Sequence, residues 1–132
     1  MSSTLNAEII TPTSHFDLGE VEYLRLPGDE GLFGIKKNHA ASLISLDVGE
    51  VKIIKNGQTE YWSTSGGILD LRNNNVQLLL ETVEKSSEID LDRATASVER
   101  AQKRLKDKTL NQARVQISLT KALNRLKVAK RS

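Results

Sequence analysis

Glycine and proline disappear from the second half of this chain. Gly67 is the last glycine and Pro27 the last proline, although the sequence continues to residue 132. Helix interiors disfavour glycine because it loses the most backbone entropy on folding, and proline because it lacks an N–H group. Before residue 86, apolar residues alternate with period two and turn residues are frequent. We therefore predict a β module over residues 1–86 and a helical module over residues 87–132.

The β module shows two hairpin signals. An apolar run at 51–54 leads into Asn56-Gly57, a pair typical of a type I′ turn because both central residues need a positive φ. A second hairpin is predicted to join 68–71 to 76–83 across the three asparagines 73–75. Turn residues recur about every 8–12 positions, which is typical of a small antiparallel sandwich or barrel rather than of a sheet with crossover helices.

The helical module shows two apolar seams with heptad spacing. The seams consist of Leu91, Ala94, Val98, Ala101 and Leu105, and of Val115, Leu119, Ala122, Leu126 and Ala129. Capping boxes are predicted at Ser87 with Asp90 and at Thr109 with Gln112. The short link between the seams predicts an antiparallel hairpin. Because the seams are rich in alanine they bury little apolar surface, so we expect the hairpin to detach easily.

The charges of the chain are divided as well. Residues 1–98 contain 8 Lys/Arg and 15 Asp/Glu, whereas residues 99–132 contain 11 and 2, a division that the formal total of +2 hides. The heptad positions place six basic residues of the hairpin on one flank: Arg93, Arg100, Arg104, Arg114, Lys121 and Arg125. Such a flank is either a solvated helix face or a surface that binds phosphate or carboxylate groups, which arginine holds bidentately.

The sequence predicts no catalytic residues and no metal site. It contains no Cys and two His, too few for a zinc site, and no nucleophile stands beside a general base. The glycine-rich stretch 28–34 is not a phosphate loop, because Gly34 is followed by Ile35 and no Ser or Thr follows the next lysines. No run approaches the roughly 18 apolar residues of a membrane span, and the first ten residues do not resemble a secretory signal. We expect a soluble intracellular protein without direct membrane insertion.

An alternative function is a nucleic-acid-binding β-barrel with a basic helical tail, which the charge of residues 99–132 permits. Five aromatic residues could stack on bases: Phe16, Tyr23, Phe33, Tyr61 and Trp62. They form no clustered motif, and the β module is acidic. Both features argue against nucleic acid as the partner.

Spaced motifs along essentially the whole chain resemble the epsilon subunits of F-type ATP synthases, the family that corresponds to the mitochondrial delta subunit. These motifs are Ile10-Thr11-Pro12, Leu26-Pro27-Gly28-x-x-Gly31-x-x-Gly34-Ile35-x-x-x-His39-Ala40, Ser65-Gly66-Gly67-Ile68-Leu69 and Ile89-Asp90-x-x-Arg93-Ala94. One departure is Lys37-Asn38 ahead of His39, where the family often has Pro-Gly. The resemblance implies an N-terminal antiparallel β-sandwich followed by a C-terminal antiparallel α-helical hairpin, in agreement with the two predicted modules.

The resemblance also implies a function, that of a non-catalytic central-stalk subunit on the cytoplasmic face of the bacterial plasma membrane. In this family the sandwich contacts the gamma subunit and the c-ring and rotates with them; the matching loop here contains Glu30, Leu32 and His39. The extended hairpin contacts the alpha and beta subunits and inhibits ATP hydrolysis. The resemblance assigns such inhibitory contacts to three basic residues, Arg114, Lys121 and Arg125.

Some bacterial members of the family bind ATP on the folded hairpin as a regulatory ligand, and the resemblance implies no other cofactor. It places the site at Glu84, Ile89, Asp90, Arg93, Ala94, Arg100, Lys121 and Arg125. The basic flank supports this hypothesis, because phosphate oxygens could be held from both helices at once. Lys121 stands where those relatives tend to have Arg, so a point charge replaces a bidentate fork. The competing interpretation is a motif that only caps the first helix.

Overall fold

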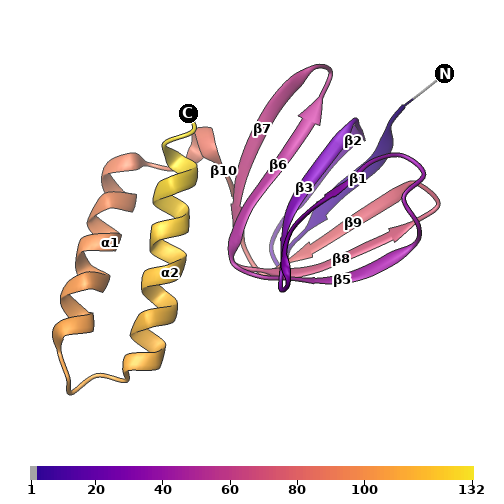
Figure 1. Cartoon of the computed structure of the whole chain (residues 1–132). Coiled ribbons are helices and arrows are strands. Elements are labelled where there is room, and N and C mark those ends of the chain that lie inside the picture. Colours follow the sequence, from indigo (N-terminus) through magenta and orange to yellow (C-terminus); the bar gives the residue numbers. More distant parts are fainter. Residues whose placement is uncertain (1–2) are drawn as a thin grey trace.

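The computed structural model describes residues 3–132, which form a β-sandwich with a helical hairpin beside it (Figure 1). The sandwich contains ten strands, and a 3₁₀ turn leads from it into the two helices. In chain order the elements are β1 (Leu5–Ile10), β2 (His15–Val21), β3 (Tyr23–Gly28), β4 (Gly31–Ile35), β5 (Ser42–Leu46), β6 (Gly49–Lys55), β7 (Gln58–Thr64), β8 (Gly67–Arg72), β9 (Asn75–Leu80), β10 (Val83–Lys85), η1 (Ser86–Glu88), α1 (Leu91–Lys106) and α2 (Gln112–Ala129).

The strands follow one hydrogen-bonded path in the order β10-β7-β6-β3-β5-β8-β9-β1-β2, with β4 paired to β3. β3 connects the two layers, because it pairs with β6 along residues 23–25 and with β5 at Gly28. The described pairings are antiparallel except that of β1 with β9, which is parallel. Period-two alternation looks the same in either strand direction, so the sequence pattern does not reveal this exception.

The core of the sandwich is one large cluster of buried side chains between the layers, including the fully buried Ile9, Leu24 and Leu69. Phe16 of β2 and Trp62 of β7 contact each other across it, with ring centroids 5.2 Å apart and planes at 70°. This edge-to-face geometry is favourable for aromatic pairs. The alternating pattern of the sequence thus becomes a closed apolar interior.

The predicted hairpins are confirmed, with one change of length. Asn56 and Gly57 have φ values of 52° and 73°, as the type I′ turn between β6 and β7 requires. The turn between β8 and β9 likewise has positive φ values at two of its asparagines. The second strand of this hairpin is shorter than expected, because β9 ends at Leu80 and Val83 begins β10, which pairs with β7 instead.

The first helix begins later than its predicted cap. Asp90, and not Ser87, is the N-cap of α1, and its side chain accepts a hydrogen bond of 3.0 Å from the Arg93 backbone N–H. Ser87 lies in η1. The capping prediction at Ser87 is wrong because Asp90 is an equally strong cap that stands directly before the helix.

The second helix differs in the same way. Asn111 is the N-cap of α2 and accepts a hydrogen bond of 3.2 Å from the Arg114 N–H. The hydroxyl of Thr109 instead donates to the Asp107 carboxylate over 2.6 Å. This hydrogen bond stabilises the connection between the helices. Because Asn111 caps α2, the predicted cap at Thr109 is also wrong.

The seams are confirmed over most of their length. Seam residues at the centre of the interface are buried: Ala94, Val98, Ala101, Val115 and Leu119. Leu91 is 47% exposed and does not belong to the seam, whereas Val128, which the heptads omit, is fully buried. Val128 lies in a cluster whose neighbours include Tyr61, so it faces the sandwich rather than only the other helix.

Candidate functional site

The hairpin contacts the sandwich through the C-terminal end of α2, which Figure 1 shows beside β10 and β7. Val128 and Ala129 pack with Ile89 and Ala94 in a small apolar cluster. Asn124 Nδ2 donates to the Gly49 carbonyl over 2.8 Å. Within residues 3–132, the hydrogen bonds and ion pairs that link the second helix and its tail to the sandwich all come from residues 124–131. The rest of the hairpin stands away from the sandwich.

The strongest contact within the predicted nucleotide site is an ion pair. Arg125 donates from Nε to Glu84 Oε1 over 2.7 Å and from Nη2 to Oε2 over 3.0 Å. The hydrogen bond to Glu84 raises the pKa of Arg125, and the negative charge of Asp90 acts in the same direction. This fork joins β10 to α2, and its geometry is the one in which arginine also binds phosphate.

The structure divides the predicted nucleotide residues into two groups. Glu84 and Arg125 meet near Asp90, the cap of α1, and the buried Ile89 and Ala94 belong to the apolar cluster beneath them. The other three are exposed along the helices: Arg93, Arg100 and Lys121. The first group therefore forms a compact base, and the second forms a basic flank that leads away from it.

Part of this flank lines a groove between the helices with a volume of about 570 Å³. Arg100 and Arg104 of α1 and Arg114 of α2 contribute to its walls. Arg100 Nη2 donates to Ser97 Oγ over 3.0 Å, and no acid among the described residues forms an ion pair with any of the three arginines. The groove is thus an open positive surface suited to acidic or phosphorylated groups.

The three predicted partner-contact residues lie at two ends of one hairpin. Glu30 and the 67% exposed Leu32 stand at the tip of β3–β4. His39 follows the other end of β4, where the neighbouring Asn38 N–H donates to Asn74 Oδ1 in the β8–β9 turn. Leu32 is already about 10 Å along the strand from Ile35, the last residue of β4, and His39 comes after that residue. The structure therefore places His39 apart from the other two residues.

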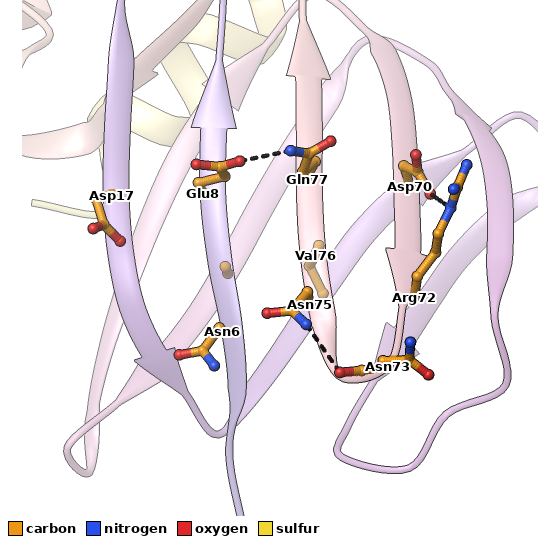
Figure 2. A pocket seen from close by; sticks show the side chains of 10 residues that line it. Asn6, Glu8, Asp17, Asp70, Arg72, Asn73, Asn75, Val76 and Gln77 are labelled. Carbon is orange, nitrogen blue, oxygen red and sulfur yellow. Dashed lines mark hydrogen bonds and ion pairs between the residues drawn. The ribbon is translucent and has the colours of Figure 1, made fainter.

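The outer face of β2, β1, β9 and β8 holds a shallow polar hollow (Figure 2). Glu8 accepts hydrogen bonds of 2.8 Å from His15 and from Gln77, and these bonds, that of His15 most of all, lower the pKa of Glu8. Asp70 accepts from Arg72 over 3.2 Å. Because these charged side chains bond to one another within the sheet, the hollow does not point to a particular ligand.

Sequence reasoning missed an apolar patch on this layer, formed by the exposed side chains of Leu43, Ile68 and Leu79. Ile68 and Leu79 are direct cross-strand partners, and Leu43 stands on the adjacent β5. The signal was the uninterrupted run of three leucines at 78–80, because a strand with one solvated face should alternate.

The aromatic side chains do not form a stacking platform for bases. Trp62 is buried against Phe16, and Tyr61 lies beneath the Arg131 guanidinium at 4.5 Å. Tyr23 lies near the Lys36 ammonium at 5.9 Å, and Phe33 packs against the core. Base stacking requires open aromatic faces, so this arrangement disfavours the nucleic-acid alternative.

Two further searches cover the described part of the chain. Across residues 3–132, no helix combines the length and the apolar character needed to cross a bilayer. The same residues contain no group of three or more His, Cys, Asp or Glu side chains that could hold a metal ion.

Comparison with known families gives matches that together span nearly the whole chain. Residues 4–86 match the β-sandwich domain of the ATP synthase delta/epsilon chain, and residues 87–130 match the long α-helix domain of the same chain. Similar curated proteins include the ATP synthase epsilon chain of Desulfitobacterium hafniense strain Y51, 34% identical over 98% of this chain and 99% of the relative. That of Nitratidesulfovibrio vulgaris strain DP4 is 37% identical over 97% of both chains.

Solved structures share the fold. A chain of the Euglena gracilis mitochondrial ATP synthase, in a structure of OSCP, F1 and the c-ring, superposes with a TM-score of 0.84 at 16% identity, covering 98% of this chain and 83% of that one. A chain from the central stalk and c-ring of the Tetrahymena thermophila mitochondrial enzyme gives a TM-score of 0.62 at 13% identity, covering 96% and 93%.

Proposed function

This chain belongs to the delta/epsilon family of ATP synthase, and on that premise we propose that it is a non-catalytic rotor subunit of the central stalk. It couples rotation of the c-ring to the catalytic core and contacts the gamma subunit through its sandwich. The chain itself lies peripherally, on the cytoplasmic face of a bacterial plasma membrane, as part of the ATP synthase complex. Full-length similarity to bacterial epsilon chains supports each of these statements.

The hairpin is the regulatory part of the subunit, and it inhibits ATP hydrolysis when it extends toward the alpha and beta subunits. The observation that carries this proposal is the attachment of α2 and its tail: within residues 3–132, their hydrogen bonds and ion pairs to the sandwich all come from residues 124–131. Beyond the dock, Arg114 and Lys121 remain exposed. A hairpin held at one end can be released as a unit and present these charges to acidic partners.

The rotor assignment is tested by purification of a tagged chain from membranes of its source cell. We expect gamma and the c-ring to co-purify with it, and a fragment of residues 1–86 to retain gamma because the last strand ends at Lys85. Leu32→Asp should weaken coupling without unfolding the sandwich, since the side chain is exposed, while the matched Gln58→Asp should not. Isolation of the catalytic core without this chain would contradict the assignment.

The folded hairpin is also proposed to bind ATP as a regulatory ligand. Glu84, Asp90 and Arg125 already lie together at the base of the helices, and Arg93 and Arg100 extend from it along α1. Arg125 is occupied by Glu84, so a phosphate must share or replace that partner. Binding to the folded form alone would stabilise it by about 2.7 kcal/mol when ATP is a hundredfold above its Kd.

Calorimetry of the isolated protein with ATP in the millimolar range tests this site. We expect heat of binding that Arg93→Ala combined with Arg125→Ala abolishes and that the matched pair Lys103→Ala and Lys106→Ala leaves unchanged. The control lysines carry the same total charge and lie on α1, as Arg93 does, outside the proposed site. If Arg93→Ala combined with Arg125→Ala leaves the heat of binding unchanged, the nucleotide site is rejected and the Ile89-Asp90-x-x-Arg93-Ala94 motif only caps the first helix.

A further inference from the structure

Three side chains form a row across the sandwich face beneath α2. Ser63 of β7 is the cross-strand partner of Glu50 on β6 and of Glu84 on β10. Direct cross-strand partners point to the same face of a sheet. Glu50 is 5% exposed and Ser63 8%, whereas the side chain of Glu84 is 40% exposed. The row therefore runs from a buried acid to a partly solvated one.

The helix and its tail provide one donor for each member of the row. Besides the fork that reaches Glu84, Asn124 Nδ2 donates to Ser63 Oγ over 3.1 Å. Arg131 donates from Nε to Glu50 Oε2 over 3.0 Å and from Nη2 to Oε1 over 3.1 Å. The two ends of the row are thus held by two arginine forks, with an amide between them.

The two forks hold different parts of the C-terminal segment. Glu84 and Glu50 are two strands apart, about 9.5 Å across a sheet. Arg125 belongs to α2, whereas Arg131 lies two residues beyond Ala129, where the helix ends. Residues six apart on a continuous helix would point about 240° apart around its axis. The end of α2 at Ala129, and not helical periodicity, therefore brings Arg131 to Glu50.

Glu50 keeps a second cationic neighbour that does not move with the hairpin. Arg25 of β3 donates from Nη2 to Glu50 Oε1 over 3.4 Å. The Nε of Arg25 is buried and has no acceptor among the described residues. Arg131 lies over the Tyr61 ring at 4.5 Å, and its bond to Glu50 raises the pKa of Arg131. When the hairpin leaves, the buried carboxylate therefore retains a partner, and release does not leave an unpaired buried charge.

We propose that Glu50, Arg131, Tyr61 and Arg25 form a latch, the Glu50 latch, that holds the hairpin folded in the absence of nucleotide. This inference rests on the proposed function in one respect, that the folded hairpin is the state that does not inhibit. The fork of Arg125 lies within the predicted nucleotide site, where phosphate competes for it. The Glu50 latch lies outside that site, so it sets the resting docked fraction and, through it, the apparent affinity for ATP.

The test measures docking in the isolated full-length chain. Because the sequence contains no Cys, Gln58→Cys and Lys108→Cys accept a dye pair that reports the distance from the sandwich to the hairpin turn. A urea series brings undocking into the measurable range, and Trp62, the one tryptophan of the chain, reports that the sandwich is still folded. The variant is Arg131→Ala, and the control is the adjacent exposed Lys130→Ala, which removes the same charge.

We expect Arg131→Ala to lower the docked-to-undocked ratio about three- to tenfold, a range reduced for the partial exposure of Arg131 to solvent. Arg131→Lys should give an intermediate value, because it keeps the charge and loses the fork. Lys130→Ala should match the parent. Equal docking in Arg131→Ala and in the parent, with Trp62 unchanged, overturns the latch.

The same variants separate this inference from the proposed function. If Arg131→Ala weakens ATP binding by no more than the factor by which it lowers the docked fraction, the result supports the latch. If the parent shows no heat with ATP but Arg131→Ala still undocks the hairpin, the latch stands and the nucleotide site fails. If the variant undocks but hydrolysis by the assembled enzyme does not fall, the latch stands and the inhibitory role fails.

Discussion

The sandwich and the hairpin are built from the same chain with very different amounts of buried apolar surface. The sandwich closes around one large cluster that includes Ile53, Trp62 and Leu69. The hairpin has two clusters, one of four buried residues and one of three, and several of these are alanines. Burial of a large apolar side chain contributes about 1.5–3 kcal/mol, and an alanine far less. We therefore expect the sandwich to fold alone and the hairpin to depend on its dock.

The polar contacts are distributed in the opposite way. On the outer face of the sandwich the polar groups largely bond to one another within the sheet, as Glu8 does with Gln77. The hairpin instead uses its charged groups to reach across the interface, from Arg125 and Arg131 to acids of the sandwich. A part with a large apolar core thus carries a hairpin that charged groups hold in place. This division is consistent with the regulatory role proposed for the hairpin.

The largest expected effect is a loss of stability when a side chain of the sandwich core is truncated. Leu69→Ala removes a fully buried side chain, and we expect it to lower the free energy of unfolding by about 2–5 kcal/mol. Leu119→Ala in the hairpin should leave the unfolding midpoint of the sandwich unchanged. Denaturation followed by Trp62 fluorescence measures both. A similar shift from the two variants would mean that the chain unfolds as one cooperative unit.

Removal of the hairpin is expected to have the next largest effect. Deletion of residues 88–132 should leave a folded sandwich, because β10 is complete and Arg25 still accompanies Glu50. In the assembled enzyme the deletion should raise ATP hydrolysis several-fold, since the inhibitory contacts are lost. Hydrolysis no faster than in the parent enzyme would contradict the inhibitory role, whereas an unfolded fragment would contradict the independence of the sandwich.

A smaller effect comes from the charges that the dock leaves free. Arg114→Ala with Lys121→Ala should relieve part of the inhibition, because charge-assisted contacts with acidic partners are only partly screened once desolvated. The proposed inhibitory set also includes Arg125, but its fork to Glu84 makes that substitution undock the hairpin as well. The pair Lys103→Ala and Lys106→Ala is the matched control. Relief of equal size in the control would indicate a general effect of charge.

Local signals in the sequence predicted most of the architecture. The change at residue 86, the Asn56-Gly57 turn and the heptad seams each depend on residues close in the chain, and propensity acts at that range. The parallel pairing of β1 with β9 joins residues about 70 positions apart, and no local pattern encodes it. The N-caps are Asp90 and Asn111 rather than Ser87 and Thr109. Several capping residues stand near the start of each helix, and only the final packing selects among them.

The candidate site was predictable to the extent that a family motif marks it. The motif located Asp90 and Arg93, and the helical period placed the basic residues on one flank. The row of Glu50, Ser63 and Glu84 was not predictable, because it is created by strand register between distant segments. Neither an acid in a strand nor an arginine near the end of a helix is unusual until the sheet places them together.

The smallest expected effect concerns pH and the turn of the hairpin. Hydrogen bonds from the Thr109 hydroxyl and N–H lower the pKa of Asp107. A carboxyl whose pKa is lowered in the folded state stabilises that state above its ordinary pKa of about 3.9, and this contribution is lost as the pH falls through the folded value. Asp107→Asn should therefore reduce the thermal midpoint of the helical signal at pH 6 and converge with the parent in strong acid. Glu99→Gln is the matched control on α1. If Asp107→Asn and the parent still differ at the lowest pH, the effect is due to packing rather than to charge. If Trp62 fluorescence shifts over the same pH range, the hairpin turn is coupled to the sandwich core.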